Sequence, residues 1–348
     1  MFPHAFARLV EPPLALARIE TQERDEYAVV YSSPESATLT RCRARVSGAL
    51  RHAARDPAGL PVVGDYVALE RGADASAPAV VRAVLPRRNL FARRGAGSGA
   101  QLQPIAANLD TLFVAVACNR DFNLRRIERY LAGAVACDVA AAVVLTKTDL
   151  ADDLAAYISA ARSVAGERPV FGICALTGAG LEDLAAFRGP HQTLAFVGSS
   201  GAGKSTLVNA LLGAQVLDTG AARADDDRGR HTTTRRQLLH LDDGTAIVDT
   251  PGMREFGLSG DDEAVASAFA DVATLAAACR FRDCRHDREP GCAVQSELDA
   301  ERLESWRKLT REALFEAGKS DHAIRKAQQR RWKSLTKSAR AFEKRRRD

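Results

Sequence analysis

The stretch Gly198-Ser-Ser-Gly-Ala-Gly-Lys204-Ser205 has the spacing of a phosphate-binding loop. An apolar run at 193–197 precedes it and a helical pattern at 204–212 follows it, which is the context that such a loop requires. The glycines permit a tight turn that aims successive backbone N–H groups at phosphates. Lys204 is expected to reach the β and γ oxygens, and Ser205 to hold a magnesium ion. The residues predicted to contact nucleotide here are Gly198, Ser199, Ser200, Gly201, Ala202, Gly203, Lys204, Ser205 and Thr206.

A motif that can read guanine, Thr146-Lys147-Thr148-Asp149, lies upstream of this loop and directly after a predicted strand at 141–145. A carboxylate at Asp149 can accept from both N1–H and the N2 amino group of guanine, a pair of donors that adenine does not offer. The stem of Lys147 is expected to lie over the base. The usual first residue of this motif is Asn, and the hydroxyl of Thr146 can replace only part of the bonding of an amide. Two residues after the next predicted strand are expected to touch the base through a backbone N–H, namely Cys174 and Ala175.

The order of the two motifs is reversed relative to an ordinary G domain, in which the phosphate loop comes first. This order predicts a circularly permuted GTPase. Two downstream motifs agree with it: Gly229-Arg-His-Thr-Thr-Thr234 as switch I, and Asp249-Thr-Pro-Gly252 at the end of a strand. Asp249 is expected to hold magnesium through water, while the Gly252 N–H senses the γ-phosphate. The predicted magnesium ligands are Ser205, Thr233 and Asp249.

The position that orients the attacking water in many GTPases carries an unusual residue. Met253 follows the glycine of the second switch motif, where a Gln is common. A thioether cannot orient water, so intrinsic hydrolysis is expected to be slow. His231 in switch I is the nearest candidate for this task, with a structural or solvent-facing role as the alternative. The predicted catalytic residues are His231, Lys204 and Thr233.

The composition describes an ordinary soluble chain with an uneven charge. It has 348 residues, 46% hydrophobic and 27% charged, and this length favours two or three domains. Residues 322–348 hold eleven Lys/Arg against two acids, a net charge of +9. The whole chain carries +5, so residues 1–321 carry −4. A basic end on a mildly acidic body predicts an anionic partner, and a solvated charge run is the alternative.

The cysteines and the apolar segments indicate the compartment. Seven cysteines, an odd number, and a start without signal-peptide character argue against a secreted disulfide framework. No stretch approaches the roughly 18 apolar residues that a membrane span needs. The sequence therefore predicts a cytoplasmic protein, and nothing in it implies an oligomer.

The pattern of predicted helices and strands changes twice along the chain. Residues 26–95 predict short strands at 26–32, 37–46, 61–70 and 78–85, a pattern that suits a small antiparallel barrel. On one of these strands Arg41, Arg43 and Arg45 share a face, which could track phosphates or simply meet water. From 110 onward, alternating strands and helices predict a doubly wound parallel sheet. Residues 259–348 are helical and charged, apart from a Cys/His cluster.

That cluster has the donors of a metal site. Three thiolates and an imidazole within fourteen residues match a tetrahedral, closed, structural zinc site. Four arginines lie around it and make the loop basic: Arg280, Arg282, Arg285 and Arg288. The predicted zinc ligands are Cys279, Cys284, His286 and Cys292.

Together these residues resemble the RsgA family, the small-ribosomal-subunit-dependent GTPases. The resemblance extends over nearly the whole chain. It includes Pro61-Val-Val-Gly-Asp65, Leu85-Pro-Arg-Arg-Asn89, the permuted order, Asp249-Thr-Pro-Gly-Met-Arg-Glu-Phe-Gly257 and Cys279-Arg-Phe-Arg-Asp-Cys284. Three features depart from the family pattern and bear on nucleotide affinity and rate: Thr146 for Asn, Cys174 for Ser, and the acidic insertion Asp225-Asp-Asp227.

The resemblance implies three domains: an N-terminal OB-fold that binds RNA (1–104), a circularly permuted GTPase domain (105–258), and a zinc-binding domain with a basic helical tail (259–348). It further implies a monomer that binds the 30S subunit and its rRNA, with GTP, magnesium and one structural zinc. Hydrolysis stimulated by that subunit would time late assembly and release. The main alternative is an rRNA-binding scaffold that binds nucleotide with little turnover, which Met253 favours. A permuted GTPase of the large subunit and a P-loop kinase fit the motifs less well.

Overall fold

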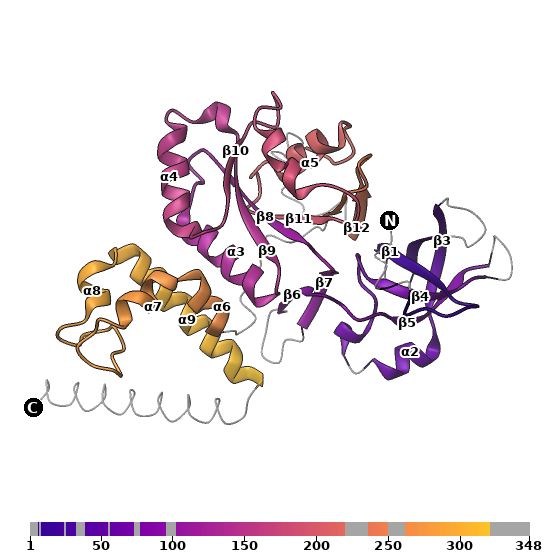
Figure 1. Ribbon diagram of the computed structural model, residues 1–348, viewed down its shortest axis with the longest axis horizontal. Helices are drawn as coiled ribbons and strands as arrows, with labels where there is room; N and C mark the ends of the chain where they lie inside the picture. Colours follow the sequence, from indigo (N-terminus) through magenta and orange to yellow (C-terminus); the bar gives the residue numbers. More distant parts are fainter. Residues whose placement is uncertain are drawn as a thin grey trace, which may run out of the picture. The chain divides into compact units, whose positions relative to one another are not determined.

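The structure is a computed structural model that describes residues 6, 8–23, 26–32, 39–54, 56–72, 77–94, 102–219, 236–249 and 262–320. The chain divides into two compact units (Figure 1). One comprises Met1–Gly95 and Gln101–Gly257, the other Ala96–Ala100 and Leu258–Asp348. The three domain ranges given above stay a prediction.

A small closed barrel begins the first unit. Its strands are β1 (Ala15–Glu23), β2 (Glu26–Ser32), β3 (Leu39–Val46), β4 (Tyr66–Glu70) and β5 (Ala79–Val84), with the short helix α2 (Gly48–Ala53) after β3. They pair in the order β1-β2-β3-β5-β4, and β4 pairs back onto β1, which closes the barrel. Alternate side chains fill its interior, among them Ala17, Ile19, Val29 and Val67. The predicted N-terminal barrel is confirmed.

β1 is a strand that the sequence analysis did not predict. Its inward positions hold small or medium apolar residues such as Ala17 and Ile19. Its outward positions hold Arg18 and Glu20, which nevertheless are buried. Residues 14–20 did not predict a strand, because proline precedes them and charged residues interrupt the apolar ones. The partners that bury these charged residues, Thr193 and His240, come from far along the chain.

The part of the unit that is predicted to bind nucleotide is a doubly wound sheet. Its strands are β8 (Thr111–Ala117), β9 (Ala140–Thr146), β10 (Val170–Ile173), β11 (Thr193–Val197), β12 (Arg236–His240) and β13 (Ala246–Asp249). They are ordered β10-β9-β8-β11-β13-β12, all parallel except β12. The three α-helices among the described residues of this part are α3 (Leu124–Ala136), α4 (Leu154–Ala165) and α5 (Lys204–Leu212).

The two faces of this sheet bury different side chains of the same strands. Leu112 and Val114 of β8 lie in one core with Ile127 of α3 and Ala161 of α4, while Phe113 lies in a second core with Leu207 of α5. Figure 1 shows α3 and α4 on one side of the sheet and α5 on the other. The parallel strands direct their carboxyl ends to one edge, where ligands bind in such folds.

The barrel and the nucleotide-binding sheet are hydrogen-bonded to each other. β12 pairs with β1 in the register Thr21↔Gln237, so among the described residues the strands form one eleven-stranded sheet. The hairpin β6 (Leu90–Arg94) and β7 (Leu102–Ala107) connects the two parts along the chain. β12, which pairs with both β1 and β13, is therefore the strand that joins them.

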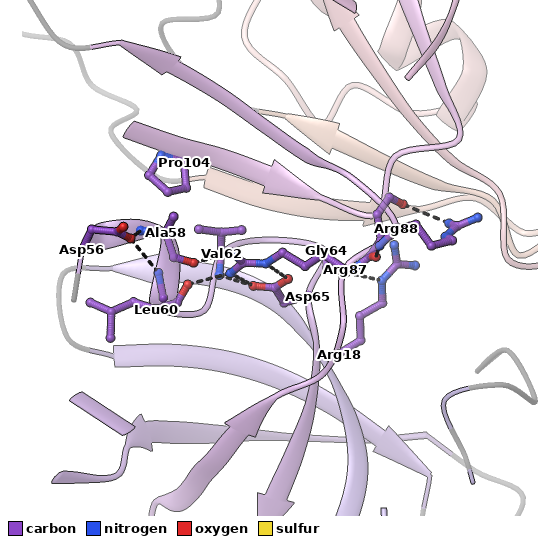
Figure 2. A network of polar contacts seen from close by, with 12 residues as sticks. Arg18, Asp56, Ala58, Leu60, Val62, Gly64, Asp65, Arg87, Arg88 and Pro104 are labelled. Atoms are coloured by element: carbon purple, nitrogen blue, oxygen red, sulfur yellow. Dashed lines mark hydrogen bonds and ion pairs between the residues drawn. The ribbon is translucent and has the colours of Figure 1, made fainter. Parts of the chain in front are cut away.

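A buried polar network stands at this connection (Figure 2). Asp65 is fully buried and accepts hydrogen bonds from Nε and Nη2 of Arg87, both at 2.7 Å, and from the Val62 N–H at 2.8 Å. Burial raises the pKa of Asp65, and the Arg87 guanidinium opposes that rise. Gly64 has φ +90°, and a Cβ there would lie 2.3 Å from the Ala107 oxygen, so a side chain does not fit. The segments 61–65 and 85–89 thus interlock through a satisfied ion pair.

Arg18 extends the network toward the nucleotide-binding sheet. It is buried, its guanidinium lies 5.0 Å from the Tyr66 ring centroid, and Nη2 donates to Thr193 Oγ1 at 2.6 Å. Thr193 begins β11, the strand that leads into the phosphate loop. A barrel side chain therefore contacts the start of that strand directly.

The second unit is helical. Its helices are α6 (Asp262–Ala268), α7 (Ala270–Ala276), α8 (Ala293–Glu297) and α9 (Ala300–Ser320). Arg302 of α9 makes two hydrogen bonds to Asp271 of α7, at 2.5 and 2.8 Å, and lies 4.8 Å from the Phe269 ring centroid. The predicted C-terminal helical region is confirmed, whereas the basic tail 322–348 lies outside the described residues. No helix in the described ranges is both long and apolar enough to cross a membrane.

Candidate functional site

The phosphate loop connects β11 to α5 at the carboxyl edge of the sheet. Gly198 has φ +152°, and a Cβ there would lie 2.2 Å from the Ala115 oxygen of β8, so the loop can pass β8 only with glycine. Lys204 Nζ donates to the carbonyl oxygens of Gly198 and Ser199 at 2.9 and 2.7 Å. The ammonium group therefore lies over the turn, where phosphate oxygens bind in such loops.

The guanine motif lies directly against the phosphate loop. Thr146, at the end of β9, is buried, and its Oγ1 donates to the carbonyl oxygen of Ala202 at 2.7 Å. Lys147 has φ +55°, a left-handed conformation that a non-glycine residue rarely adopts. The Thr146 hydroxyl thus joins the two loops, which are 56 residues apart in the chain.

The Asp149 carboxylate has a side-chain partner that sequence reasoning missed. Cys174 follows β10, is buried, and its thiol lies 3.2 Å from Asp149 Oδ1 as a donor. The turn after it is closed by two backbone hydrogen bonds, Cys174 N–H to Ala179 O and Gly178 N–H to Cys174 O, both at 2.9 Å. From the sequence, Cys174 was expected to contact the base through its backbone alone. Its thiol was the signal for the contact with Asp149, since a thiol can donate to a carboxylate as a hydroxyl does.

A second thiol lies near the same carboxylate. Burial and the negative charge of Asp149 raise the pKa of Cys118 to about 11. Cys118 therefore stays protonated at neutral pH. It follows β8 directly, and its N–H donates to the Thr146 carbonyl at 2.8 Å.

Asp249, the candidate magnesium ligand of the second switch motif, ends β13, the strand beside β11. Burial raises the pKa of its carboxyl, while a contact from Gln237 and the charge of Lys204 oppose the rise. Gln237 Nε2 lies 3.5 Å from Asp249 Oδ2, a long contact that was not anticipated. Ser205 is the second residue of α5 at the same edge. The predicted residues His231, Thr233 and Gly252, with Met253, lie outside the described residues.

The Cys/His cluster of the second unit brings four donors together. One atom each of Cys279, Cys284, His286 and Cys292 lies within 4.8 Å of the others. The Cys279 and Cys292 sulfurs are 3.9 Å apart, and His286 Nδ1 lies 3.4 Å from Cys292 Sγ. Thiolates at about 2.3 Å from a tetrahedral zinc are separated by about 3.8 Å, so the donor set and spacing suit zinc. The Trp306 ring lies edge-on to His286, with centroids 5.6 Å apart.

A phosphate loop and a guanine motif in contact, with the guanine motif earlier in the chain, define a circularly permuted P-loop GTPase. The chain belongs to the RsgA GTPase family, whose model matches residues 84–259. A curated relative from Opitutus terrae, "Small ribosomal subunit biogenesis GTPase RsgA", is 42% identical over 99% of this chain and 95% of its own length. A second, "Small ribosomal subunit biogenesis GTPase RsgA 2" of Lactiplantibacillus plantarum, is 43% identical over 86% of this chain and 84% of its own length.

Two solved structures share the fold. YjeQ from Thermotoga maritima covers 86% of this chain and 99% of its own, at 24% identity and a TM-score of 0.62. YloQ, described as a circularly permuted GTPase, covers 87% and 96%, at 21% identity and a TM-score of 0.58. At these identities the likeness supports the architecture, while membership of the family rests on the family model and the curated relatives.

Proposed function

We propose that this protein is a GTPase of small ribosomal subunit biogenesis that hydrolyses GTP to GDP and phosphate when bound to that subunit. The hydrogen bond from Thr146 to Ala202 is the observation that supports the GTPase part, because one nucleotide could bind both loops only if they lie together. The ribosomal part rests on the names of the curated relatives. Such a protein would work in the cytoplasm, as a monomer.

The described residues support distinct roles in binding GTP. Asp149, oriented by the Cys174 thiol, would accept from the guanine edge. Backbone N–H groups of the phosphate loop and Lys204 would hold the phosphates. Ser205 and Asp249, with Thr233, would hold magnesium, which neutralises charge on the phosphate oxygens. The remaining proposed nucleotide contacts are Thr146, Lys147, Thr148, Ala175, Thr206 and Gly252.

The proposed hydrolysis lacks the usual residue that orients the attacking water, which explains the need for a partner. Met253 cannot orient water, so we assign that task to His231, which the ribosomal subunit would position. The basic segment 322–348 and the arginines around the Cys/His cluster would contact rRNA. The four ligands of that cluster would hold a structural zinc, which stabilises the loop that carries these arginines.

The first test is GTP turnover by the full chain alone and with purified 30S, 50S or 70S particles. Lys204→Ala is the blank, because it removes the ammonium group from the phosphate loop. We expect strong stimulation by 30S particles alone. Tight GTP-dependent 30S binding without stimulation would instead indicate a scaffold, and stimulation by 50S alone would overturn the assignment to the small subunit.

His231→Ala should lose the stimulated turnover and keep GTP binding. Turnover as in the wild type would exclude His231 from catalysis.

A further inference from the structure

An aromatic side chain is exposed in the metal-binding loop of the second unit. Phe281 stands between the ligands Cys279 and Cys284, and 40% of it is exposed to solvent. In the same unit Phe269 is buried. Because the loop is anchored by four metal-type ligands, its exposed ring is held on a fixed scaffold and does not contribute to the core.

Four arginines lie around Phe281 in this loop. Arg280, Arg282, Arg285 and Arg288 are exposed, and within the described ranges none of them forms an ion pair with a carboxylate. The Arg280 guanidinium lies 5.5 Å from the centroid of the Phe281 ring. Guanidinium groups without carboxylate partners keep their donors available for phosphate oxygens.

Two of the acidic residues in the loop are already engaged. The Glu289 carboxylate accepts from the N–H groups of Asp287, Arg288 and Arg285 at 2.9 to 3.1 Å. These hydrogen bonds lower the pKa of Glu289 to about 2. Asp287 lies 4.0 Å from Arg307 of α9. A third acid, Asp283, is exposed, and residues 280–289 hold four arginines against three acids. The loop therefore carries a net charge of +1 beside one exposed aromatic ring.

We infer that residues 280–288 form a binding surface for single-stranded RNA, in which Phe281 stacks on an unpaired base and Arg280 and Arg282 contact the flanking phosphates. Exposed aromatic rings between cationic side chains are how many proteins bind unpaired bases, since every base offers a stacking face. A protein partner would have to supply carboxylates to these arginines. The inference rests on the proposed function, which supplies an RNA partner, and adds which side chains hold it.

The test measures binding of the zinc-loaded full chain to a labelled single-stranded RNA of about 12 nucleotides by fluorescence anisotropy. Phe281→Ala is expected to weaken binding by about 5- to 150-fold, the usual effect of removing one stacked base. The dependence of affinity on salt should not change, because the phosphate contacts remain. Phe281→Trp should bind as the wild type does, since it keeps a stacking surface.

The matched control is Phe315→Ala, which removes another exposed ring of the same unit and should bind RNA normally. An oligomer of the same length with abasic riboses gives a second control. The wild type should bind it about as weakly as Phe281→Ala binds RNA. Zinc content, measured for every variant, shows whether the loop is still assembled. If Phe281→Ala loses zinc, Phe281→Leu keeps an apolar side chain without a stacking ring and replaces it.

The outcomes separate this inference from the proposed function. RNA binding by Phe281→Ala or Phe281→Leu at the wild-type level would overturn the stacking role and leave the ribosomal assignment intact. Normal RNA binding with impaired 30S binding would favour a protein partner at this loop, which also overturns it. A wild type that binds neither RNA nor 30S particles would remove the proposed function itself.

Discussion

Many arginines of the barrel and those of the metal-binding loop differ in what their guanidinium groups contact, although Arg43 of β3 is exposed and forms no ion pair with a carboxylate among the described residues. Four barrel arginines pair with carboxylates: Arg41 with Glu20, Arg45 with Glu26, Arg82 with Glu70, and Arg87 with Asp65. The four loop arginines have no such partner within the part of the chain that the structure describes. A cluster of arginines in a sequence can therefore serve either to stabilise a fold or to bind a partner.

Burial varies strongly among the barrel pairs. In the Arg87–Asp65 pair the side chains are 15% and 0% exposed, and in the Arg41–Glu20 pair 66% and 7%. In the Arg82–Glu70 pair both are about half exposed. Since water screens exposed charges, the pairs should contribute to stability in this order. Substitutions in the buried barrel pairs should therefore change stability, and substitutions in the loop should change binding.

The largest effect is expected from losing a metal ligand. Cys292→Ser should leave no zinc in the purified protein and abolish the contribution of residues 280–288 to RNA binding, because such loops depend on their metal for folding. The barrel should still unfold at its wild-type urea concentration. Cys42→Ser, which changes a barrel cysteine outside the cluster, is the control and should retain zinc. A zinc-free Cys292→Ser protein with normal RNA binding would show that the loop needs no metal.

The next effect concerns the most buried ion pair. Asp65→Ala removes the acceptor of the Val62 N–H and leaves the Arg87 charge with only the carbonyl oxygens of Ala58 and Leu60. It should lower the free energy of unfolding by about 3 to 5 kcal/mol. Urea unfolding followed by circular dichroism measures it. Glu70→Ala removes an acid of the exposed pair and should not shift the transition measurably. Equal transitions for both variants would show that burial does not separate these pairs.

Glu20→Gln tests the pair that also reaches the nucleotide-binding sheet. Glu20 accepts from Arg41 Nε at 2.8 Å and lies 2.8 Å from Nε2 of His240 on β12. Burial favours the protonated acid, but the hydrogen bonds to His240 and Arg41 outweigh burial and hold the pKa of Glu20 below its ordinary value of 4.5. The stabilisation is therefore fully present above pH 4.5 and is lost as the pH falls through the lower folded-state pKa.

At neutral pH we expect Glu20→Gln to lower the free energy of unfolding by about 1 kcal/mol, since Arg41 is largely exposed. Below the folded-state pKa the difference from the wild type should vanish. Glu26→Gln, which breaks an exposed pair on the same barrel, is the control and should differ little at any pH. A Glu20→Gln difference that does not depend on pH would exclude the carboxylate charge as its cause.

The smallest change in stability is expected in the loop. Arg282→Ala should alter the free energy of unfolding by less than about 0.5 kcal/mol. It should nevertheless reduce the slope of log affinity for RNA against log salt by about 0.7, the share of one phosphate contact. Arg45→Ala removes a paired arginine from the barrel face and should leave this slope unchanged. An equal loss of slope in both variants would mean that the barrel face binds RNA as the loop does.

Much of the fold followed from local patterns, and the exceptions share one cause. The strands of the barrel, the alternating strands and helices, and the Cys/His spacing were visible because each depends on neighbours in the chain. β1 was not, since its outward Arg18 and Glu20 are covered by Thr193 and His240. A charged residue is read as solvent-facing unless its partner is known.

The candidate site likewise combines residues that the sequence predicts with contacts that it does not predict. The motifs place Lys204 and Asp149 in a nucleotide site because their spacing is short and specific. The contact of Asp149 with Cys174 joins the loops after β9 and β10, and that of Asp249 with Gln237 joins β13 and β12. No spacing rule predicts which side chains meet across a sheet. His231, Thr233 and Gly252 stay predictions.

The sequence by itself determined the class of this protein, because the order of two short motifs records a circular permutation and each motif is read from adjacent residues. It also determined the donor set of the metal-binding loop. Only the tertiary structure decided which arginines are neutralised, how the Thr146 hydroxyl joins the two nucleotide loops, and that β12 carries the barrel on the edge of the sheet. These depend on contacts between residues far apart in the chain, whose partners are chosen by packing.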